Sequence, residues 1–179
     1  MAEGNGGFSR PVVATAGTEQ LRPRARTVVL RAVDAEAATL DFYTDRRSLK
    51  VEHLAANPHL GWTCWDDEAQ VQFCAGGTAR ILDDAVCRST FDSLPKHGRR
   101  AYATLEAPGT PLPGPAAGLP ADWEDRGLPD TDYARDNFAI IRCYLEWADV
   151  LHLDRAGNTR LAARRENAAE PWTFTFIVP

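Results

Sequence analysis

The sequence predicts a mainly β protein, an antiparallel β-barrel that carries a few short helices. Runs of alternating apolar and polar residues recur at short, regular spacing between Gly, Pro and Asp turns, which is typical of barrels or sandwiches. Only two segments have helical periodicity. The 179 residues are 44% hydrophobic, which suffices for a sizeable core, so we expect residues 1–179 to form one domain.

The predicted strands are rich in β-branched and aromatic residues. The run 26–33 reads as one strand, on which Arg26 and Arg31 point to opposite faces because they are five positions apart. In the last run Trp172, Phe174 and Phe176 share a face that we expect to lie in the core. The predicted strands cover residues 10–17, 26–33, 38–44, 59–65, 70–76, 78–82, 137–154 and 171–178.

Two helices interrupt the strands. The first is expected over residues 48–56, where Asn57 and Pro58 end it. The second follows the N-cap candidates Asp83 and Asp84 and ends before Pro95.

Two further segments fit neither pattern. Residues 1–9 are expected to be a disordered lead-in. Residues 107–130 are rich in Pro and Gly, and so long a loop serves as an arm, a lid or a partner-wrapping segment, or is disordered. The sequence does not decide among these roles.

Charge and cysteine content argue against several classes of function. The net charge of −5 disfavours nucleic acid or an anionic membrane as partner, and no apolar run is long enough to span a bilayer. The four cysteines contain no C-x-x-C pair and read as reduced thiols of a cytoplasmic protein. His53 and His59 have no cysteine at ligand spacing, so we expect no metal site.

The stretch TDRRSLK, residues 44–50, places cations where a helix begins, although the helix dipole disfavours them there. A bound anion would explain this, because helix amides, the Ser48 hydroxyl and the Lys50 ammonium together suit a phosphate. Arg46 and Arg47 could add to such a cradle. The alternative is a solvated turn with both arginines facing water.

Four motifs occur in an order that resembles the FMN-binding half of the pyridoxamine 5′-phosphate oxidase family. They are RTVVLR (26–31), FYTDRRSLK (42–50), LAANP (54–58) and AQVQFCAG (69–76). The resemblance covers about residues 10–82 and is specific as an ordered set. It implies the FMN-binding split β-barrel fold and a homodimer with FMN between the subunits.

The resemblance also implies roles for single residues. Arg26 and Lys50 would hold the FMN phosphate with hydroxyls from Thr44 and Ser48, and Arg46 or Arg47 could replace a family arginine that is Leu49 here. Arg31 stands where the family has a lysine near the flavin ring. The other implied FMN contacts are Thr27, Val28, Val29 and Leu30 along the ring, Tyr43 beside it, Gln70 at its polar edge, and Arg164 from the partner subunit.

The family's substrate-binding residues are only partly matched. RLAAR (160–164) aligns with a segment whose first arginine, Arg160 here, touches the substrate, but Ala162 replaces the family's histidine. The family's substrate-phosphate clamp would fall at Thr90 and Leu94, which cannot replace a phenol and a cation. We therefore expect a small-molecule substrate other than pyridoxamine phosphate.

Two functions remain open at this stage. The first is an FMN-dependent oxidoreductase in which the flavin N5 accepts hydride and no catalytic side chain is required. The second is a non-catalytic split-barrel protein that binds flavin, or a different cofactor such as deazaflavin or haem.

Overall fold

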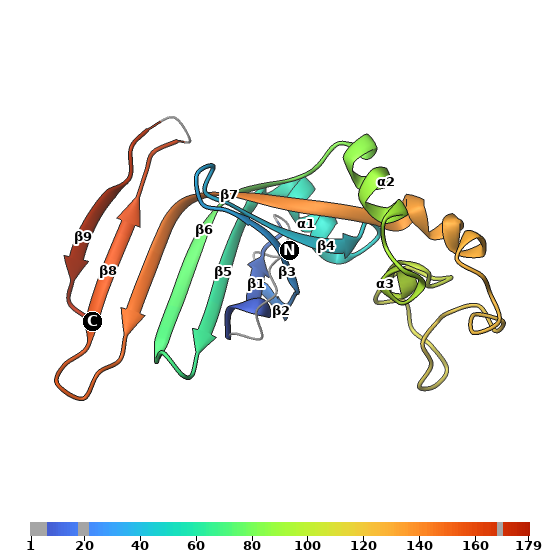
Figure 1. Cartoon of the computed structure of the whole chain (residues 1–179), viewed down its shortest axis with the longest axis horizontal. Helices are drawn as coiled ribbons and strands as arrows, with labels where there is room; N and C mark the ends of the chain where they lie inside the picture. Colours follow the sequence, from blue (N-terminus) through green and yellow to red (C-terminus); the bar gives the residue numbers. More distant parts are fainter. Residues whose placement is uncertain (1–6, 18–21, 168–169) are drawn as a thin grey trace.

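The computed structural model describes residues 7–17, 22–167 and 170–179. Antiparallel strands curl into a half-barrel with few short helices, as the sequence predicts (Figure 1). The strands are β1 (Val12–Thr15), β2 (Arg24–Thr27), β3 (Leu30–Asp34), β4 (Thr39–Asp45), β5 (His59–Asp66), β6 (Val71–Ile81), β7 (Phe138–His152), β8 (Thr159–Arg164) and β9 (Thr173–Ile177). The helices are α1 (Leu49–Ala56), α2 (Asp84–Asp92) and α3 (Lys96–Arg99), with 3-10 turns η1 (Gly7–Ser9), η2 (Arg100–Tyr102) and η3 (Pro129–Asn137).

The long strand β7 joins two parts of the sheet. The strand order is β2-β1-β5-β6-β7-β4-β3, and β8 and β9 continue from β7 on the edge that it shares with β4. Residues 138–144 of β7 pair with β4, whereas residues 147–152 pair with β8. Figure 1 shows β8 and β9 at one end of the sheet, far from α1 near its centre.

The bend of the sheet depends on two glycines in β6. The register between β6 and β7 shifts between Gly76 and Gly77. A Cβ on Gly76 would lie 2.7 Å from the Trp147 ring, and one on Gly77 would collide with the Tyr144 carbonyl. The absence of a side chain therefore permits the close backbone approach of this bulge.

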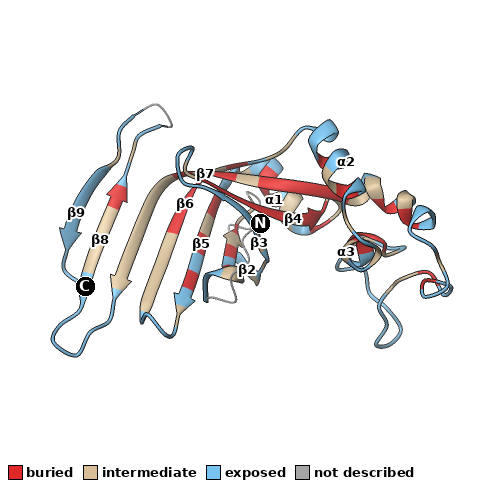
Figure 2. Ribbon diagram, in the orientation of Figure 1, coloured by how far each residue is buried: buried red, intermediate tan, exposed pale blue. Residues whose placement is uncertain are grey.

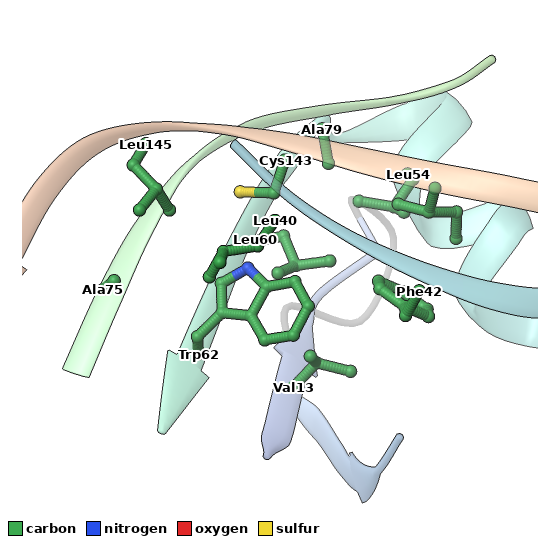
Figure 3. Packing of buried hydrophobic residues seen from close by; sticks show 11 residues of the cluster. Val13, Leu40, Phe42, Leu54, Leu60, Trp62, Ala75, Ala79, Cys143 and Leu145 are labelled. Atoms are coloured by element: carbon green, nitrogen blue, oxygen red, sulfur yellow. The ribbon is translucent and has the colours of Figure 1, made fainter. Parts of the chain in front are cut away.

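Two hydrophobic cores lie on opposite faces of β4. Leu40 and Phe42 face the first, where the Phe42 ring meets the Trp62 indole edge-on at 5.5 Å (Figure 3). Tyr43 packs against the second, around Phe138. Because both faces are covered, β4 and the first half of β7 are the most continuously buried strands (Figure 2).

The second core holds α2, η2 and η3 against the sheet, and a buried arginine ties them together. The Arg99 side chain is 4% exposed and forms an ion pair of 2.8 Å with Asp132. Its guanidinium also donates to Thr131 and to the carbonyls of Leu94, Leu128 and Asp92. Every part of this buried charge thus has a partner.

The segment 26–33 corrects one sequence prediction. It is not one buried strand but two strands: β2 pairs with β1, whereas β3 pairs with β4. The chain leaves the first strand at Val28, whose amide donates to the Pro11 carbonyl, and Val29 is exposed. Most of the segment is exposed in the single chain.

The C-terminal strand corrects another prediction. Phe174 and Phe176 are 65% and 77% exposed, so these two residues are not part of the core (Figure 2), whereas Trp172 packs against the first core as predicted. The strand does pair with β8, but it extends the sheet beyond the area that α1 and the half-barrel enclose. Alternation therefore identified the strand but not what covers it.

Parts of the two segments outside the strand pattern pack against the sheet or the second core. Of the predicted lead-in, residues 1–6 lie outside the described part, while residues 7–9 form η1, with the Phe8 ring against Phe73. In the Pro/Gly-rich segment 107–130, Trp123 is buried in the second core and the Lys96 ammonium lies 5.5 Å from its ring. None of the helices in the described residues is long and apolar enough to cross a membrane.

Candidate functional site

A polar cluster forms where β4 meets the start of α1. The Lys50 ammonium donates to the Thr44 hydroxyl at 2.8 Å and to the Ser48 hydroxyl at 3.0 Å, and both hydroxyl residues are buried. Ser48 is the N-cap residue of α1, but its side chain turns toward Lys50 and forms no cap hydrogen bond. The amide of Val51 donates to the Ser48 carbonyl, so the amides of Leu49 and Lys50 are the ones that stay available to an anion.

The second cation of the cluster comes from β2. The Arg26 guanidinium donates to the Thr15 hydroxyl at 2.8 Å, and that hydroxyl also lies 3.2 Å from the Nδ1 atom of His53 on α1. The sequence singled out neither Thr15 nor His53 for this site, because their partners lie 11 and 38 residues away. We call Arg26, Lys50, Thr44, Ser48 and Thr15 the cradle.

The two cations of the cradle have lowered pKa values and no acidic partner among the described residues. Burial, followed by the charge of Arg26, lowers the pKa of Lys50 below its ordinary value. Burial, followed by the charge of Arg24, likewise lowers the pKa of Arg26. Neither cation forms an ion pair with a carboxylate of the described residues. Two half-buried like charges without a counter-ion are unfavourable, and a bound dianion would remove the cost.

Arg46 and Arg47 do not belong to the cradle, which corrects the suggestion that they help to hold the anion. Arg46 forms a 2.6 Å ion pair with Asp84 at the start of α2. Arg47 grips both oxygens of the buried Asp45 and donates to the Thr104 carbonyl. Both arginines connect the loop before α1 to distant segments. The alternative of a free, solvated turn is also wrong for them.

Arg31 and Tyr43 form a second group beside the cradle. Arg31 is the extra residue of a β-bulge, because Leu30 pairs with Phe42 whereas Ala32 pairs with Asp41. The Arg31 guanidinium lies 5.1 Å from the centre of the Tyr43 ring. Thr27, Val28, Val29 and Leu30 lie on the chain between Arg26 and Arg31, so their backbone connects the two groups.

The other predicted site residues lie elsewhere in the single chain. Gln70 is in the β5–β6 turn, where its side chain donates to Asp67. Thr15 of the cradle pairs with Leu60, six residues before the end of β5, so Gln70 lies about 20 Å along the strand from it. Arg160 and Arg164 are on β8, five strands from β2, or about 24 Å along the sheet.

Arg160 is already engaged in the single chain. Its Nε atom lies 3.0 Å from both carboxylate oxygens of Asp149, and this pairing raises the pKa of the guanidinium. Arg164 is exposed and, among the described residues, pairs through its backbone with Trp147 and Thr173. One chain therefore brings together Arg26, Lys50, Thr44, Ser48, Arg31 and Tyr43, but not Gln70, Arg160 or Arg164.

The fold and the cradle together define a class: a split β-barrel protein with two cations and buried hydroxyls gathered at the start of a helix. Residues 3–83 match the model of the family described as "Pyridoxamine 5'-phosphate oxidase, FMN-binding domain". This match covers a little under half of the chain, and over that region it confirms the resemblance noted in the sequence. No curated protein matches the chain.

Solved structures share the fold over nearly the whole chain. A pyridoxamine 5′-phosphate oxidase-related, FMN-binding protein from Nostoc punctiforme superimposes with a TM-score of 0.79 at 21% identity, covering 96% of this chain and 88% of the other. PhzG from Burkholderia lata, in complex with tetrahydrophenazine-1-carboxylic acid, gives 0.72 at 14% identity, covering 96% and 82%. At these identities the likeness establishes the fold alone.

The residues present fit a flavin phosphate. The cradle supplies two cations without carboxylate partners, buried hydroxyls, and helix amides that no side chain caps. A phosphate dianion needs this donor set, whereas a metal ion would need acids or imidazoles. The described residues contain no group of three His, Cys, Asp or Glu side chains able to hold a metal.

Proposed function

We propose that the chain is an FMN-dependent oxidoreductase that works as a homodimer on a small molecule other than pyridoxamine phosphate. The observation that carries this proposal is the pair of half-buried cations, Arg26 and Lys50, neither of which forms an ion pair with a carboxylate of the described residues. Proteins bury a charge at this cost where a ligand completes the site. The match of residues 3–83 to an FMN-binding domain supports FMN as this ligand.

In this proposal, the protein binds and orients the flavin, which supplies two-electron hydride chemistry when bound. Lys50, Arg26 and the start of α1 hold the phosphate. The backbone from Thr27 to Leu30 leads away from the cradle and offers its peptide groups to the ring. The Arg31 guanidinium, next along the chain, places a positive charge where a reduced flavin would be anionic.

The separation of the predicted site residues supports the homodimer. Gln70 and Arg164 cannot reach the cradle of their own chain if the spacing along the sheet is kept. A second copy can bring its β8 to the cradle of the first. In that arrangement each site is completed by the partner, and a flavin-loaded monomer in solution would contradict it.

The substrate side argues against a phosphorylated substrate. Leu94 packs against the second core and Thr90 is partly buried on α2, so neither offers a charge. Arg160, which the resemblance makes a substrate residue, is paired with Asp149.

A cytoplasmic location also remains our proposal, supported by four cysteines that are all free thiols.

The test compares FMN with riboflavin, which lacks the phosphate. Replacing Lys50 by alanine should weaken FMN binding about tenfold to a hundredfold, since a charged hydrogen bond is worth about 1.5–3 kcal/mol, and should leave riboflavin binding nearly unchanged. Fluorescence quenching of each flavin measures both affinities. The matched control is Arg46→Gln, which removes a nearby cation that already has an acidic partner. Equal losses for both flavins in Lys50→Ala would mean that the phosphate is held elsewhere.

A further inference from the structure

A second polar group lies at the end of the proposed ring path, outside the cradle. Tyr102, on η2, has a ring that is buried in the second core and packs edge-on against Phe138 at 4.9 Å. Tyr43 packs against the same Phe138 ring at 5.0 Å. Phe138 thus holds both tyrosines, and Arg31 lies over one of them.

The Tyr102 hydroxyl makes no structural hydrogen bond within the described residues. It forms no hydrogen bond with any described residue, although the rest of the side chain is buried. A buried hydroxyl without a partner would be an orphaned polar atom, and the Tyr102 hydroxyl is not one among the described residues. The hydroxyl therefore reaches solvent. The backbone carbonyl of Tyr102 accepts a hydrogen bond from Asn137, which fixes the residue in place. The phenol is therefore preorganised and available.

The charge next to this phenol has no acidic partner among the described residues, although the proposed ring path also passes it. Arg31 is exposed and forms no ion pair with a carboxylate of the described residues, while Asp41, on the strand opposite, is taken up by Arg142 at 2.7 Å. Burial raises the pKa of Tyr102 to about 12, and the positive charge of Arg31 acts in the opposite direction. The hydroxyl thus stays protonated at neutral pH and can donate a hydrogen bond, within the field of the guanidinium.

We propose that Arg31 and Tyr102 form a carboxylate subsite on the substrate side of the flavin, with the Tyr43 ring as its aromatic wall. One cation and one neutral phenol match a carboxylate, which carries one charge and two acceptor oxygens. They do not match a phosphate dianion, for which the cradle provides two cations. The β-bulge at Arg31 supports the assignment, since bulges redirect side chains next to active sites.

The subsite names the substrate class of the proposed oxidoreductase and rests on that function for the position of the ring. The substrate would be a small planar molecule that carries a carboxylate. Tyr102 would act as a specificity-determining residue: it donates to the carboxylate and takes no part in hydride transfer. Sequence reasoning did not find it, because nothing in the motif order places η2 beside β4.

Calorimetric titration of the protein with benzoate, with and without FMN, tests the subsite. We expect Tyr102→Phe, which removes only the hydroxyl, to weaken benzoate binding about fivefold to tenfold. Arg31→Gln should weaken it roughly tenfold or more, since a charged bond is lost. Benzamide, the uncharged analogue, should bind wild type at least about tenfold more weakly than benzoate does.

The controls separate the subsite from the fold and from flavin binding. Tyr144→Phe removes a hydroxyl that bonds Arg80 elsewhere on the sheet and should leave benzoate affinity unchanged. FMN affinity of Tyr102→Phe should stay within about twofold of wild type, because the hydroxyl does not contact the cradle. Failure of FMN to bind wild type would overturn the proposed function alone. Benzoate that does not bind, or that binds Tyr102→Phe and Tyr144→Phe equally, would overturn the subsite.

Discussion

The cradle and the Arg99 cluster treat buried positive charge in opposite ways. Arg99 has a carboxylate, a hydroxyl and three carbonyls around its guanidinium, so the folded chain itself satisfies the charge. Lys50 and Arg26 meet hydroxyls and one distant carbonyl but no carboxylate. A charge that the fold satisfies supports the structure, whereas a charge that the fold leaves unneutralised is kept for a ligand.

The largest effect should come from removing the satisfied charge. Arg99→Ala should lower the free energy of unfolding by about 3–5 kcal/mol, because Asp132 and several buried carbonyls lose their partner. Urea denaturation measures this loss. Arg88→Ala, which breaks an exposed ion pair with Asp136, should change stability by less than about 1 kcal/mol. Similar losses in the two variants would show that the Arg99 cluster is not a structural centre.

Arg47 forms an ion pair with Asp45, the acid that acts on Lys50, and so connects a satisfied charge to the cradle. Arg47→Gln should lower stability by about 2 kcal/mol, since Asp45 is buried and would lose its charged donor. Asp45 would then act on Lys50, whose pKa it already raises slightly, and would compete with a bound phosphate. FMN affinity should fall more than riboflavin affinity. An unchanged ratio of the two affinities would mean that Asp45 does not control the cradle.

Removing a charge that the fold leaves unneutralised should raise, rather than lower, the free energy of unfolding of the protein without ligand. Lys50→Met should raise the free energy of unfolding by on the order of 1 kcal/mol at neutral pH. Burial lowers the pKa of Lys50 in the folded chain, so the unfolded chain binds more protons as pH approaches the ordinary value of 10.5. Wild type therefore gains stability with rising pH in that window, and the advantage of Lys50→Met shrinks. Stability curves at several pH values measure the trend, and a constant difference would contradict it.

The smallest effect should be at Arg46, whose ion pair with Asp84 is exposed. Arg46→Gln should change the free energy of unfolding by at most about 1 kcal/mol in thermal or urea unfolding. A loss as large as that of Arg47→Gln would place Arg46 among the structural arginines, despite its exposure.

Much of the fold could be predicted because it depends on local patterns. The alternation in β4, the Asn57-Pro58 stop after α1 and the acidic start of α2 each identified their element. The motif order also identified Thr44, Ser48, Lys50 and Arg26, which the structure brings together.

The errors came from contacts that no local pattern records. Arg46 and Arg47 meet Asp84 and Thr104, which are 38 and 57 residues away, so the sequence could not distinguish them from Lys50. The division of residues 26–33 depends on two different partner strands, and the apolar face of β9 has the period of a core strand without a cover. Local periodicity predicts secondary structure but not its neighbours.

The exposed face of β9 has a consequence for the behaviour of the chain in solution. Phe174 and Phe176 stand in water on a strand that has a neighbour, β8, on one edge only within the described residues. Open strand edges with apolar side chains are templates for further β pairing. The colloidal stability of the lone folded chain is therefore set by this terminal hairpin and not by its well-packed cores. A charged residue in place of Phe176 should raise the concentration at which the purified chain remains clear.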